Sequence, residues 1–405
     1  MKALVLAGGR GGNMAPFSQT RPNPMIPVAG RYMIDHTLEA LRHAGVSLVN
    51  LVVGHKQEVI RDHFGAGHPS EMTINLVDQG KAPGIGGAIL AARPHFVPGE
   101  HFLLVYADTL AGANIFSVTM QSFGLRNEAT AAICLTRSSQ MYGNVYIGAD
   151  MRITKMVEKP KNADLGNYVL AGVFVLPVTF FDILEKAGGD MEKALIRQVS
   201  GDGLHAAIWE DNWLDMAYPW DVLEANRIIM DQWTEASIHH SVKLHNTIIH
   251  GPVKICEGAE VSAGVVLEGP AYIGPGAFIG HNTLIRPYAC IGARSVVGHG
   301  AELKNCVIFP GALIGGLSFI GDSVVGENVD IGTGTMTINR NLDNTKVQVK
   351  IGKNMMETGM EKLGSFIGDG ARVGASNILA PGSMLEAGAL IPHNVSYPRR
   401  KGREG

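Results

Sequence analysis

A six-residue repeat in the C-terminal part of the chain restricts the fold more than any other feature of the sequence. From Ile255, successive groups of six each begin with an aliphatic residue, and small residues recur at the second, fourth and fifth places. The phase runs to Leu303, returns at Val325 and returns again at Ile367. A short fixed period is typical of a solenoid, in which each coil buries its apolar positions against the next coil. Three such groups form one triangular coil, so the sequence predicts a left-handed parallel β-helix of hexapeptide repeats over residues 236–397.

Two interruptions separate the phased blocks, at 309–319 and at 337–365. Insertions into a solenoid protrude from it, and such loops often carry binding residues. A tolerated surface loop is the simpler interpretation. The polar residues Asn339, Arg340 and Lys346 in the second interruption favour a functional segment.

The first part of the chain, residues 1–235, follows a different pattern. Apolar runs such as ALVLA, LVNLVVG and HFLLVYAD alternate with segments of helical periodicity. Alternation of this kind predicts an α/β domain, Rossmann-like, with a mostly parallel sheet covered by helices. Ligands of such sheets bind at the carboxyl ends of the strands. The basic tail 398–405 is interpreted as a solvated end.

Composition limits the class of protein. The chain has 405 residues, 46% of them hydrophobic and 18% charged, and this composition suits large buried cores. Its net charge of −3 does not indicate a nucleic-acid-binding protein. The 4 cysteines form no CxxC pair and are interpreted as reduced thiols. No apolar run approaches the length of a membrane span, and the first residues lack the apolar core of a signal peptide. We expect a cytoplasmic protein without membrane or nucleic-acid partners.

A glycine-rich turn follows the first apolar run, in the stretch LAGGRGGNMAPFSQTRPNPM from Leu6 to Met25. A strand, a glycine-rich turn and a helix aim backbone N–H groups at phosphates. Such sites normally add fixed cations, yet the neutral residues Asn13 and Asn23 lie inside this stretch.

The whole chain resembles the bifunctional sugar-1-phosphate nucleotidylyltransferase/acetyltransferases of the archaeal type, which join these two kinds of domain in this order. The family turn reads L-A-A-G-x-G-T-R-M followed by R-P-K-P-M, and this chain reads LAGGRGGNM and RPNPM. The resemblance implies that a nucleoside triphosphate and a sugar-1-phosphate are the substrates. The implied nucleotide-binding residues are Leu6, Gly8, Gly9 and Gly11, with Gln79 and Gly84 at the base.

The resemblance also implies the residues of the reaction. Asp108 in VYADTL and Asp215 in NWLDMAY match the aspartates that bind Mg²⁺, whereas Glu158 and Lys159 in VEKP match the sugar and phosphate contacts. Asp108, Asp215 and Lys159 are the expected catalytic residues: the carboxylates hold the metal and the lysine aligns the attacking phosphate. An aspartate at the end of a strand also commonly caps a turn, which is the alternative for each carboxylate taken alone.

Several positions of this site differ from the family. Asn13 stands in place of an arginine and Asn23 in place of a lysine that hold the triphosphate. Loss of such an arginine costs about 10³-fold or more in phosphoryl transfer. Three nearby cations could compensate for this loss: Arg10, Arg21 and Lys81. Three further positions also differ from the family. Ile85 replaces a threonine, Ala107 replaces a glycine, and Leu170 replaces an asparagine that binds the sugar.

The acetyltransferase half shows the same mixture. Acetyl-CoA is the implied cosubstrate, and Arg286, Lys304, Asn339 and Lys346 match residues that bind the sugar phosphate or acetyl-CoA. In GGLSFIGD, however, Gly316 replaces the histidine that acts as general base, and Phe319 replaces a tyrosine; Asp330 replaces an asparagine further on. Loss of a general base costs roughly 10²–10⁴-fold. His281 and His299 are possible replacements or simply exposed residues of the coils.

Two functions therefore remain open. The first is an enzyme that makes a nucleotide sugar and releases pyrophosphate, with acetyl transfer as a second activity. The second is a non-catalytic relative that binds nucleotide sugar and regulates or scaffolds an active partner. A purely structural protein leaves the retained aspartates, Asp108 and Asp215, unexplained. In either case the resemblance implies a homotrimer, because hexapeptide β-helices associate through their flat faces.

Overall fold

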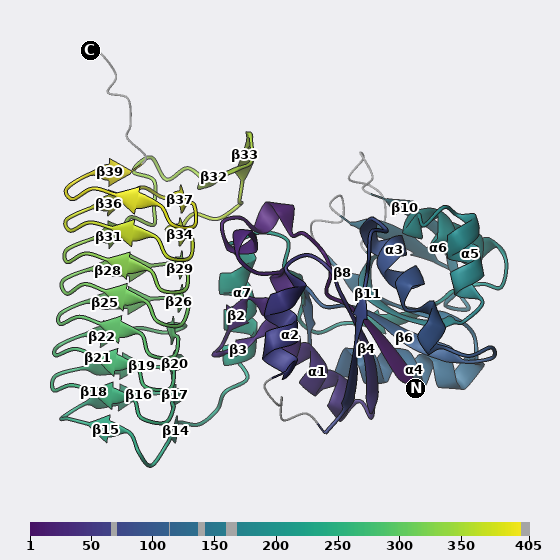
Figure 1. The fold of residues 1–405 in the computed structure, drawn as a ribbon, viewed down its shortest axis with the longest axis horizontal. Helices are drawn as coiled ribbons and strands as arrows, with labels where there is room; N and C mark the ends of the chain where they lie inside the picture. The colour runs from purple at the N-terminus through teal and green to yellow at the C-terminus, as the bar shows by residue number, and fades with distance from the viewer. Residues whose placement is uncertain (66–70, 113, 137–141, 159–167, 398–405) are drawn as a thin grey trace. The chain divides into compact units, whose positions relative to one another are not determined.

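The chain forms two compact units, and each unit consists of several separate segments of the sequence. The computed structural model describes residues 1–405 except 66–70, 113, 137–141, 159–167 and 398–405 (Figure 1). The N-terminal unit comprises Met1–Arg10, Pro22–Met25 and Met33–Asp215, and the C-terminal unit comprises Gly11–Arg21, Ile26–Tyr32 and Met216–Gly405. Two segments near the N-terminus thus belong to the C-terminal unit. The domain boundary at residues 235 and 236 stays a prediction, and the basic tail 398–405 lies outside the described residues.

A nine-stranded mixed sheet forms the centre of the N-terminal unit. Its parallel part has the order β6, β1, β4, β5, and β11 joins it antiparallel to β6. The strands of this sheet are β1 (Lys2–Leu6), β4 (Leu48–Val53), β5 (Thr73–Asp78), β6 (His101–Tyr106), β8 (Thr130–Leu135), β9 (Gly143–Ile147), β10 (Ile153–Glu158), β11 (Tyr168–Pro177) and β12 (His205–Trp209). A separate ribbon pairs β7 (Thr109–Ala111) with β13 (Trp213–Asp215).

Helices pack on this sheet as the alternating pattern predicts. Helix α3 contacts β1 and β4, and helix α4 contacts β8, β11 and β12. The helices of the unit are α1 (Met33–His43), α2 (Gln57–Gly65), α3 (Gly84–Ala91), α4 (Asn114–Arg126), α5 (Phe180–Lys186) and α6 (Met191–Ser200), with the short 3₁₀ helices η3 (Asn23–Met25) and η4 (Arg93–His95). The predicted α/β domain is therefore confirmed.

The C-terminal unit is a left-handed parallel β-helix with three eight-stranded faces, whose coils are stacked in Figure 1. The covered face contains β14 (Ser237–Ile238), β17 (Val253–Ile255), β20 (Ala271–Ile273), β23 (Cys290–Ile291), β26 (Val307–Ile308), β29 (Val324–Val325), β34 (Phe366–Ile367) and β37 (Met384–Leu385). The second face contains β15 (Lys243–Leu244), β18 (Glu260–Val261), β21 (Phe278–Ile279), β24 (Val296–Val297), β27 (Leu313–Ile314), β30 (Asp330–Ile331), β35 (Arg372–Val373) and β38 (Leu390–Ile391). The third face contains β16 (Ile248–His250), β19 (Val266–Glu268), β22 (Leu284–Ile285), β25 (Glu302–Lys304), β28 (Phe319–Gly321), β31 (Met336–Thr337), β36 (Ile378–Leu379) and β39 (Ser396–Tyr397).

The aliphatic residues that begin each group of six form the core of the β-helix. Ile255, Val261 and Leu267 from the second coil are buried, and so are their equivalents in the next coils. Each of these side chains stacks on the residue in register one coil further along, as Val261 does on Ile279. The hexapeptide period therefore predicted both the architecture and the inward-facing positions.

The first predicted interruption, 309–319, is not an insertion, and that prediction was wrong. Strands β27 and β28 continue the stack there without a protruding loop. The apparent break arises because one turn before it and one after it, Leu303–Ile308 and Ile320–Val325, place successive inward residues five positions apart instead of six. A shortened turn moves the phase of the repeat but keeps the coil.

The second interruption, 337–365, does leave the stack, as predicted. It contains an antiparallel hairpin of β32 (Gln348–Ile351) and β33 (Asn354–Glu357), after which β34 resumes the covered face (Figure 1).

Helix α7 (Asp221–Met230) and the early segment 26–32 pack on the covered face within the C-terminal unit. The segment contains the short ribbon β2 (Pro27–Val28) and β3 (Arg31–Tyr32), joined at Gly30. Gly30 has a positive φ of 87°, and a Cβ there would lie 2.2 Å from Cζ of Tyr272. Only glycine allows the ribbon to approach the β-helix this closely.

Asn226 of α7 joins the ribbon to the β-helix. Its side chain is fully buried; Oδ1 accepts a hydrogen bond from the backbone N–H of Ala29 at 3.0 Å, and Nδ2 donates to the carbonyl oxygen of Tyr288 at 3.0 Å. Two backbone groups from distant parts of the sequence therefore depend on one amide.

Among the described residues, no helix is both long and apolar enough to cross a membrane. Of the free thiols, Cys134, Cys290 and Cys306 are buried and Cys256 is half-buried. Burial raises the pKa of Cys134 and of Cys290 to about 12, so both are protonated at neutral pH.

We predict that Asn226→Leu lowers the free energy of unfolding by about 2–4 kcal/mol, because leucine fills the space but leaves the Ala29 N–H and the Tyr288 carbonyl buried without partners. Thermal or urea unfolding measures the change. The control is Arg227→Ala on the same helix, where an exposed ion pair with Glu224 is lost, with an expected effect under about 1 kcal/mol. Equal effects of the two changes would contradict the prediction.

Candidate active site

The carboxyl ends of the parallel strands meet at one edge of the N-terminal sheet and enclose a cavity of about 810 Å³. Leu6 at the end of β1 lies in register with Tyr106 at the end of β6, and β4 and β5 end beside them. Residues that follow these strand ends form the lining: Leu6, Gly8, Gly9, Arg10, Gly54, His55, Gln79, Gly80, Lys81, Ala82, Pro83, Gly84, Ile85, Ala88, Tyr106 and Asp108. Most predicted nucleotide-binding residues therefore share this one cavity, which we name the nucleotide cavity.

Gln79 braces the wall of the nucleotide cavity. Its Nε2 donates to the carbonyl oxygens of Ala82 at 2.8 Å and Gly84 at 3.0 Å. A Cβ on Gly8 would lie 2.6 Å from Oε1 of Gln79. The amide therefore fixes the turn before α3 and packs on the glycine-rich turn, so Gln79 and Gly84 act together in shaping the wall; their contact with the base stays a prediction.

The two predicted metal-binding aspartates come from neighbouring elements. Asp108 lines the nucleotide cavity directly before β7, and Asp215 ends β13, where it lies opposite Thr109 in the antiparallel ribbon. Burial raises the pKa of Asp108. Among the described residues, no group of three His, Cys, Asp or Glu side chains could hold a metal ion. A pair of carboxylates still suits Mg²⁺, which is commonly held by one or two carboxylates together with substrate phosphates and water.

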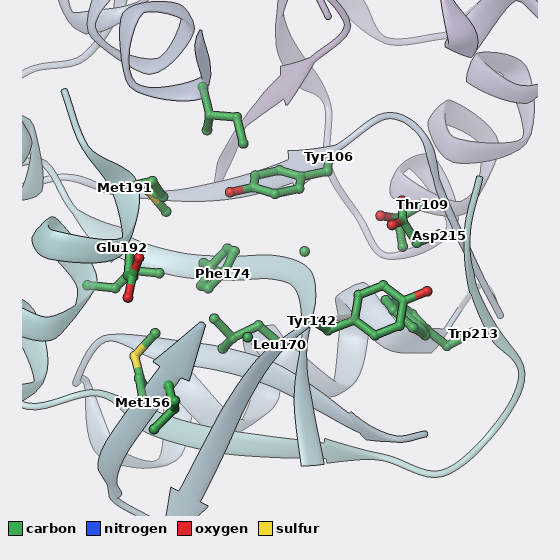
Figure 2. A pocket seen from close by; sticks show the side chains of 15 residues that line it. Tyr106, Thr109, Tyr142, Met156, Leu170, Phe174, Met191, Glu192, Trp213 and Asp215 are labelled. Carbon is green, nitrogen blue, oxygen red and sulfur yellow. The ribbon is translucent and has the colours of Figure 1, made fainter. Parts of the chain in front are cut away.

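A second cavity of about 370 Å³ adjoins the first, since Ile85 and Tyr106 line both. We name it the acceptor cavity, after the sugar-1-phosphate that the resemblance implies as the acceptor of the nucleotide. Figure 2 shows Thr109 and Asp215 at one end of it, with Tyr142 beside Trp213 below them. The rings of Tyr142 and Trp213 meet edge to face, with centroids 5.1 Å apart. Lys159 lies outside the described residues, and Glu158 is described only as the last residue of β10.

The predicted phosphate-binding turn is divided between the two units. Leu6, Gly8, Gly9 and Arg10 belong to the N-terminal unit, whereas Gly11 begins a segment, Gly11–Arg21, that belongs to the C-terminal unit. This segment contains the 3₁₀ helices η1 (Gly12–Met14) and η2 (Phe17–Gln19). The assignment of Gly11 to the same phosphate site as Gly8 therefore stays a prediction, and Gly11 is absent from the lining of the nucleotide cavity.

Arg21 fixes the end of this segment on the β-helix. Its side chain is only 6% exposed and forms ion pairs with Glu327 at 2.8 Å and with Asp369. Its guanidinium also lies 5.2 Å from the ring centroid of Phe309. Burial alone would lower the pKa of Arg21, but the charges and hydrogen bonds of Asp369 and Glu327 outweigh it and raise that pKa. Arg21 is therefore committed to structure.

Further contacts hold the same segment. Thr20 Oγ1 donates to Asp369 at 2.6 Å, Gln19 Oε1 accepts from the backbone N–H of Ala387 at 2.9 Å, and the buried ring of Phe17 packs 5.2 Å from that of Phe309. Of the three cations considered as substitutes, Arg10 and Lys81 line the nucleotide cavity, whereas Arg21 is occupied by its ion pairs with Glu327 and Asp369.

The two neutral substitutions differ in their surroundings. Asn13 is exposed in the segment that packs on the β-helix. Asn23 is 6% exposed, and its Oδ1 has no hydrogen-bond partner among the described residues. A buried carbonyl oxygen without a partner costs about 1–3 kcal/mol. Neither asparagine lines the nucleotide cavity.

In the C-terminal unit, a cavity of about 520 Å³ brings two of the predicted acetyltransferase residues together. Arg286 and Lys304 both line it, and Arg286 forms an ion pair with Glu302 at 2.9 Å. The complete lining is Leu223, Glu224, Arg227, Arg286, Pro287, Tyr288, Lys304, Asn305, Asp322, Met360 and Lys362. The two shortened turns of the β-helix form part of its wall, because they contain Asn305 and Asp322, which are hydrogen-bonded at 2.7 Å.

The other predicted residues of this half lie around the cavity without lining it. Asn339 donates to Asp322 at 2.5 Å, so one hydrogen bond links it to the wall. Lys346 pairs with Glu361 at 3.3 Å on the hairpin segment. Asp330 is exposed on the second face, in register with Arg372.

Gly316 stands directly above His299 of the preceding coil. A Cβ on Gly316 would lie 2.8 Å from both Nδ1 and the carbonyl oxygen of His299. The stacking of the coils therefore excludes a side chain at position 316 in this conformation. His299 is exposed and touches the position implied for the base, whereas His281 lies one coil further back.

The sequence alone did not single out Tyr106, Tyr142 and Trp213, which line the acceptor cavity. Spacing offered one signal: Tyr106 precedes Asp108 by two residues, and Trp213 precedes Asp215 by two. Tyr142 directly precedes β9, far in sequence from the other two residues, and no local pattern marks it.

Comparison with known proteins places the chain among nucleotidyltransferases. The family model described as "Nucleotidyl transferase" matches residues 2–232, and the model described as "GMPPB C-terminal domain" matches residues 267–360. A protein of Methanococcus maripaludis named "Bifunctional protein GlmU" is 33% identical over 407 residues, which cover 98% of this chain and 95% of that protein. A protein of Sulfurisphaera tokodaii named "Bifunctional sugar-1-phosphate nucleotidylyltransferase/acetyltransferase" is 29% identical, with 98% of both chains covered.

Among solved structures, a UDP-glucose pyrophosphorylase from Acinetobacter baumannii is similar in fold. It has a TM-score of 0.51 and 20% sequence identity, and the match covers 56% of this chain and 91% of that structure. At this identity the likeness establishes the fold of one domain only.

We predict that Asp369→Ala lowers the unfolding free energy of the C-terminal unit by about 3 kcal/mol, because it leaves the buried Arg21 guanidinium without its closest counter-charge. Thermal unfolding of the full chain measures this change. Glu386→Ala is the control, since Glu386 is exposed and accepts a hydrogen bond from Gln19 of the same segment. The stabilising role of the Arg21–Asp369 ion pair is disproved if the two variants unfold at the same temperature.

We also predict that Asp108→Asn stabilises the protein at neutral pH. Because burial raises the pKa of Asp108 in the folded state, its ionisation costs folding free energy. This cost is absent below about pH 4, the ordinary pKa of aspartate, and reaches its full value once the pH exceeds the raised pKa. The unfolding temperature of the variant should therefore exceed that of the wild type at pH 7 and match it in acid. Asp202→Asn, at an exposed site, is the control; a variant less stable than the wild type at pH 7 would refute the prediction.

Proposed function

Since the chain belongs to the family of bifunctional sugar-1-phosphate nucleotidylyltransferase/acetyltransferases, we propose that it is a nucleotidylyltransferase that makes a nucleotide sugar and releases pyrophosphate. One observation carries this proposal: two cavities share the walls Ile85 and Tyr106, and each contains one aspartate of the pair. Asp108 lies in the nucleotide cavity and Asp215 in the acceptor cavity. This arrangement suits two phosphorylated substrates that react where the cavities meet.

In the proposed reaction, an oxygen of the sugar-1-phosphate attacks the α-phosphorus of the nucleoside triphosphate. The new P–O bond forms as the bond to the β-phosphate oxygen breaks, and pyrophosphate leaves with its electron pair. Positioning and neutralisation of charge account for most catalysis of this kind. Asp108 and Asp215 would hold Mg²⁺, which supplies positive charge at the phosphates. Lys159 is proposed to align the attacking phosphate.

Arg10 and Lys81 are proposed to supply the charge that Asn13 and Asn23 lack. Both cations line the nucleotide cavity, on the glycine-rich turn and on the turn that Gln79 braces. Arginine and lysine are the side chains that suit phosphate, whereas asparagine donates a hydrogen bond without charge.

The C-terminal cavity is proposed to bind a sugar phosphate or acetyl-CoA rather than to catalyse rapid acetyl transfer. Arg286 and Lys304 provide positive charge there, but Gly316 offers no general base. Without a base, acetyl transfer is expected to be slower by roughly 10²–10⁴-fold.

A homotrimer in the cytoplasm is the proposed assembly. Phe278, Val296 and Leu313 stack in register on the second face and are 36%, 38% and 45% exposed. A continuous apolar column on a flat sheet face suits burial against identical subunits.

Pyrophosphate release tests the proposed function. We expect release by the full chain with Mg²⁺ when nucleoside triphosphates and sugar-1-phosphates are screened together, and a loss of about 10²–10³-fold or more in Asp108→Ala. Arg10→Ala and Lys81→Ala should each reduce kcat/KM by at least about 10-fold, whereas Lys186→Ala, an exposed lysine of α5, should leave it unchanged.

Three outcomes are informative. Turnover that survives Asp108→Ala would overturn the assignment of that residue. Absence of turnover, combined with binding of nucleotide in a calorimeter, would overturn the enzyme and support the alternative of a regulatory binding protein. Absence of both turnover and binding would overturn both.

A further inference from the structure

One wall of the acceptor cavity consists of hydrocarbon and thioether side chains. Figure 2 shows Leu170, Phe174 and Met156 gathered away from the end that contains Thr109 and Asp215. The other apolar residues of the described lining are Ile85, Val157, Met191 and Leu195. Glu192 also lines this end, but its side chain is exposed. The cavity therefore has a polar end and an apolar wall.

The backbone of β11 creates this wall. Leu170, Gly172 and Phe174 occupy alternate positions and all line the cavity, although the pairing of β11 with β8 is irregular between Leu170 and Phe174. Gly172 has a positive φ of 76°, and a Cβ there would lie 3.1 Å from Oγ1 of Thr109. The irregularity thus keeps two large apolar side chains on one side of the cavity while the strand passes close to the polar end.

The nearest indole does not add a donor to this wall. Trp213 lines the cavity, but its Nε1–H donates to the carbonyl oxygen of Ala171 at 3.0 Å. The uncharged polar side chains of the described lining are the hydroxyl groups of Tyr106, Thr109 and Tyr142.

The polarity of the cavity orients a substrate. The anomeric phosphate belongs at the end with Asp215, beside the nucleotide cavity, so the sugar itself, including the substituents on C2 and C6, faces Leu170, Phe174 and Met156. A hydroxyl placed against Leu170, Phe174 and Met156 exchanges hydrogen bonds to water for apolar contacts, which is unfavourable unless it reaches Glu192 or Tyr106. A methyl or methylene group at the same place gains from burial. An acetamido group would also bring a carbonyl oxygen that needs a donor.

We infer that the acceptor is a deoxysugar-1-phosphate, whose apolar carbon packs against Leu170, and that Leu170 determines this specificity. The inference rests on the proposed nucleotidyl transfer and deepens it by naming the class of acceptor. The nucleotide is transferred to the sugar phosphate as described above, with pyrophosphate as the leaving group.

The test compares glucose-1-phosphate with two acceptors that each lack one of its oxygen atoms and with one that carries an acetamido group. With the full chain, Mg²⁺ and the best nucleoside triphosphate, kcat/KM is measured for glucose-1-phosphate, 6-deoxyglucose-1-phosphate, 2-deoxyglucose-1-phosphate and N-acetylglucosamine-1-phosphate. We expect one deoxysugar phosphate to exceed glucose-1-phosphate by about 10–100-fold, the range for a small apolar difference in a hydrophobic pocket. The better of the two deoxysugars identifies which carbon faces the wall. A preference for either glucose-1-phosphate or the acetamido sugar would overturn the inference.

Leu170→Asn tests the residue. Asparagine is close to leucine in size and offers both a donor and an acceptor, so the ratio between deoxysugar and glucose phosphates should fall by at least about 10-fold. Leu135→Asn is the matched control: Leu135 lies on β8 of the same sheet, is 55% exposed and does not line the cavity, so the ratio should stay at the wild-type value. An unchanged ratio in Leu170→Asn would show that Leu170 does not set specificity.

Direct binding separates this inference from the proposed function. The same four sugar phosphates are titrated into the protein by calorimetry without turnover. Tighter binding of a deoxysugar phosphate by a protein that releases no pyrophosphate would retain the acceptor class and overturn nucleotidyl transfer. Turnover of all four sugars at similar rates and affinities would retain nucleotidyl transfer and overturn the acceptor class.

Discussion

The buried ion pairs of Arg21 with Glu327 and Asp369 constrain the rest of the molecule, because they fix an early segment of the chain within the C-terminal unit. A guanidinium that is 6% exposed has given up most of its water, and separating it from its carboxylates costs several kcal/mol. Residues 11–21 are therefore held on the β-helix, while residues 6–10 continue β1 at the nucleotide cavity. Arg10 and Gly11 are consecutive, so the glycine-rich stretch passes from one unit to the other between these two residues.

The regular part of the β-helix could be predicted because its period repeats the same physical requirement in every coil. An inward aliphatic residue is needed at each group of six, and Ile255, Val261 and Leu267 show it in succession. The period failed where two turns are one residue shorter, around Asn305 and Asp322. A turn can lose a residue when an asparagine or aspartate adopts a positive φ, which occurs at both positions. Such a shortened turn shifts the phase of the repeat in the sequence as an insertion would, although the strands continue the stack.

The candidate site was predicted less completely, for reasons of the same kind. Gly8, Gln79 and Asp108 follow strand ends, and parallel strands bring those ends together, so their meeting in one cavity could be expected. The sequence did not show that Arg21 is unavailable, because its partners Glu327 and Asp369 lie more than 300 residues away. It also did not show that Gly316 lies against His299, since that contact depends on the distance between stacked coils. Tertiary partners of this kind leave no mark in local sequence.

Two kinds of departure from the family in the N-terminal half affect different quantities. Replacing fixed cations by Asn13 and Asn23 removes charge that acts on the transition state, an effect of about 10³-fold when nothing replaces it. Packing one methyl group against Leu170 contributes about 1 kcal/mol through burial, and the predicted preference over a hydroxyl there is about 10–100-fold. The apolar wall therefore cannot offset the missing charge, which is the reason for proposing that Arg10 and Lys81, both in the lining of the nucleotide cavity, supply it. What the wall can do is discriminate: a contact far from the reacting phosphate helps one acceptor over another without changing the chemistry at the α-phosphorus. The two proposals therefore assign rate and specificity to separate sets of residues: Arg10 and Lys81 line the nucleotide cavity, and Leu170 lines the acceptor cavity.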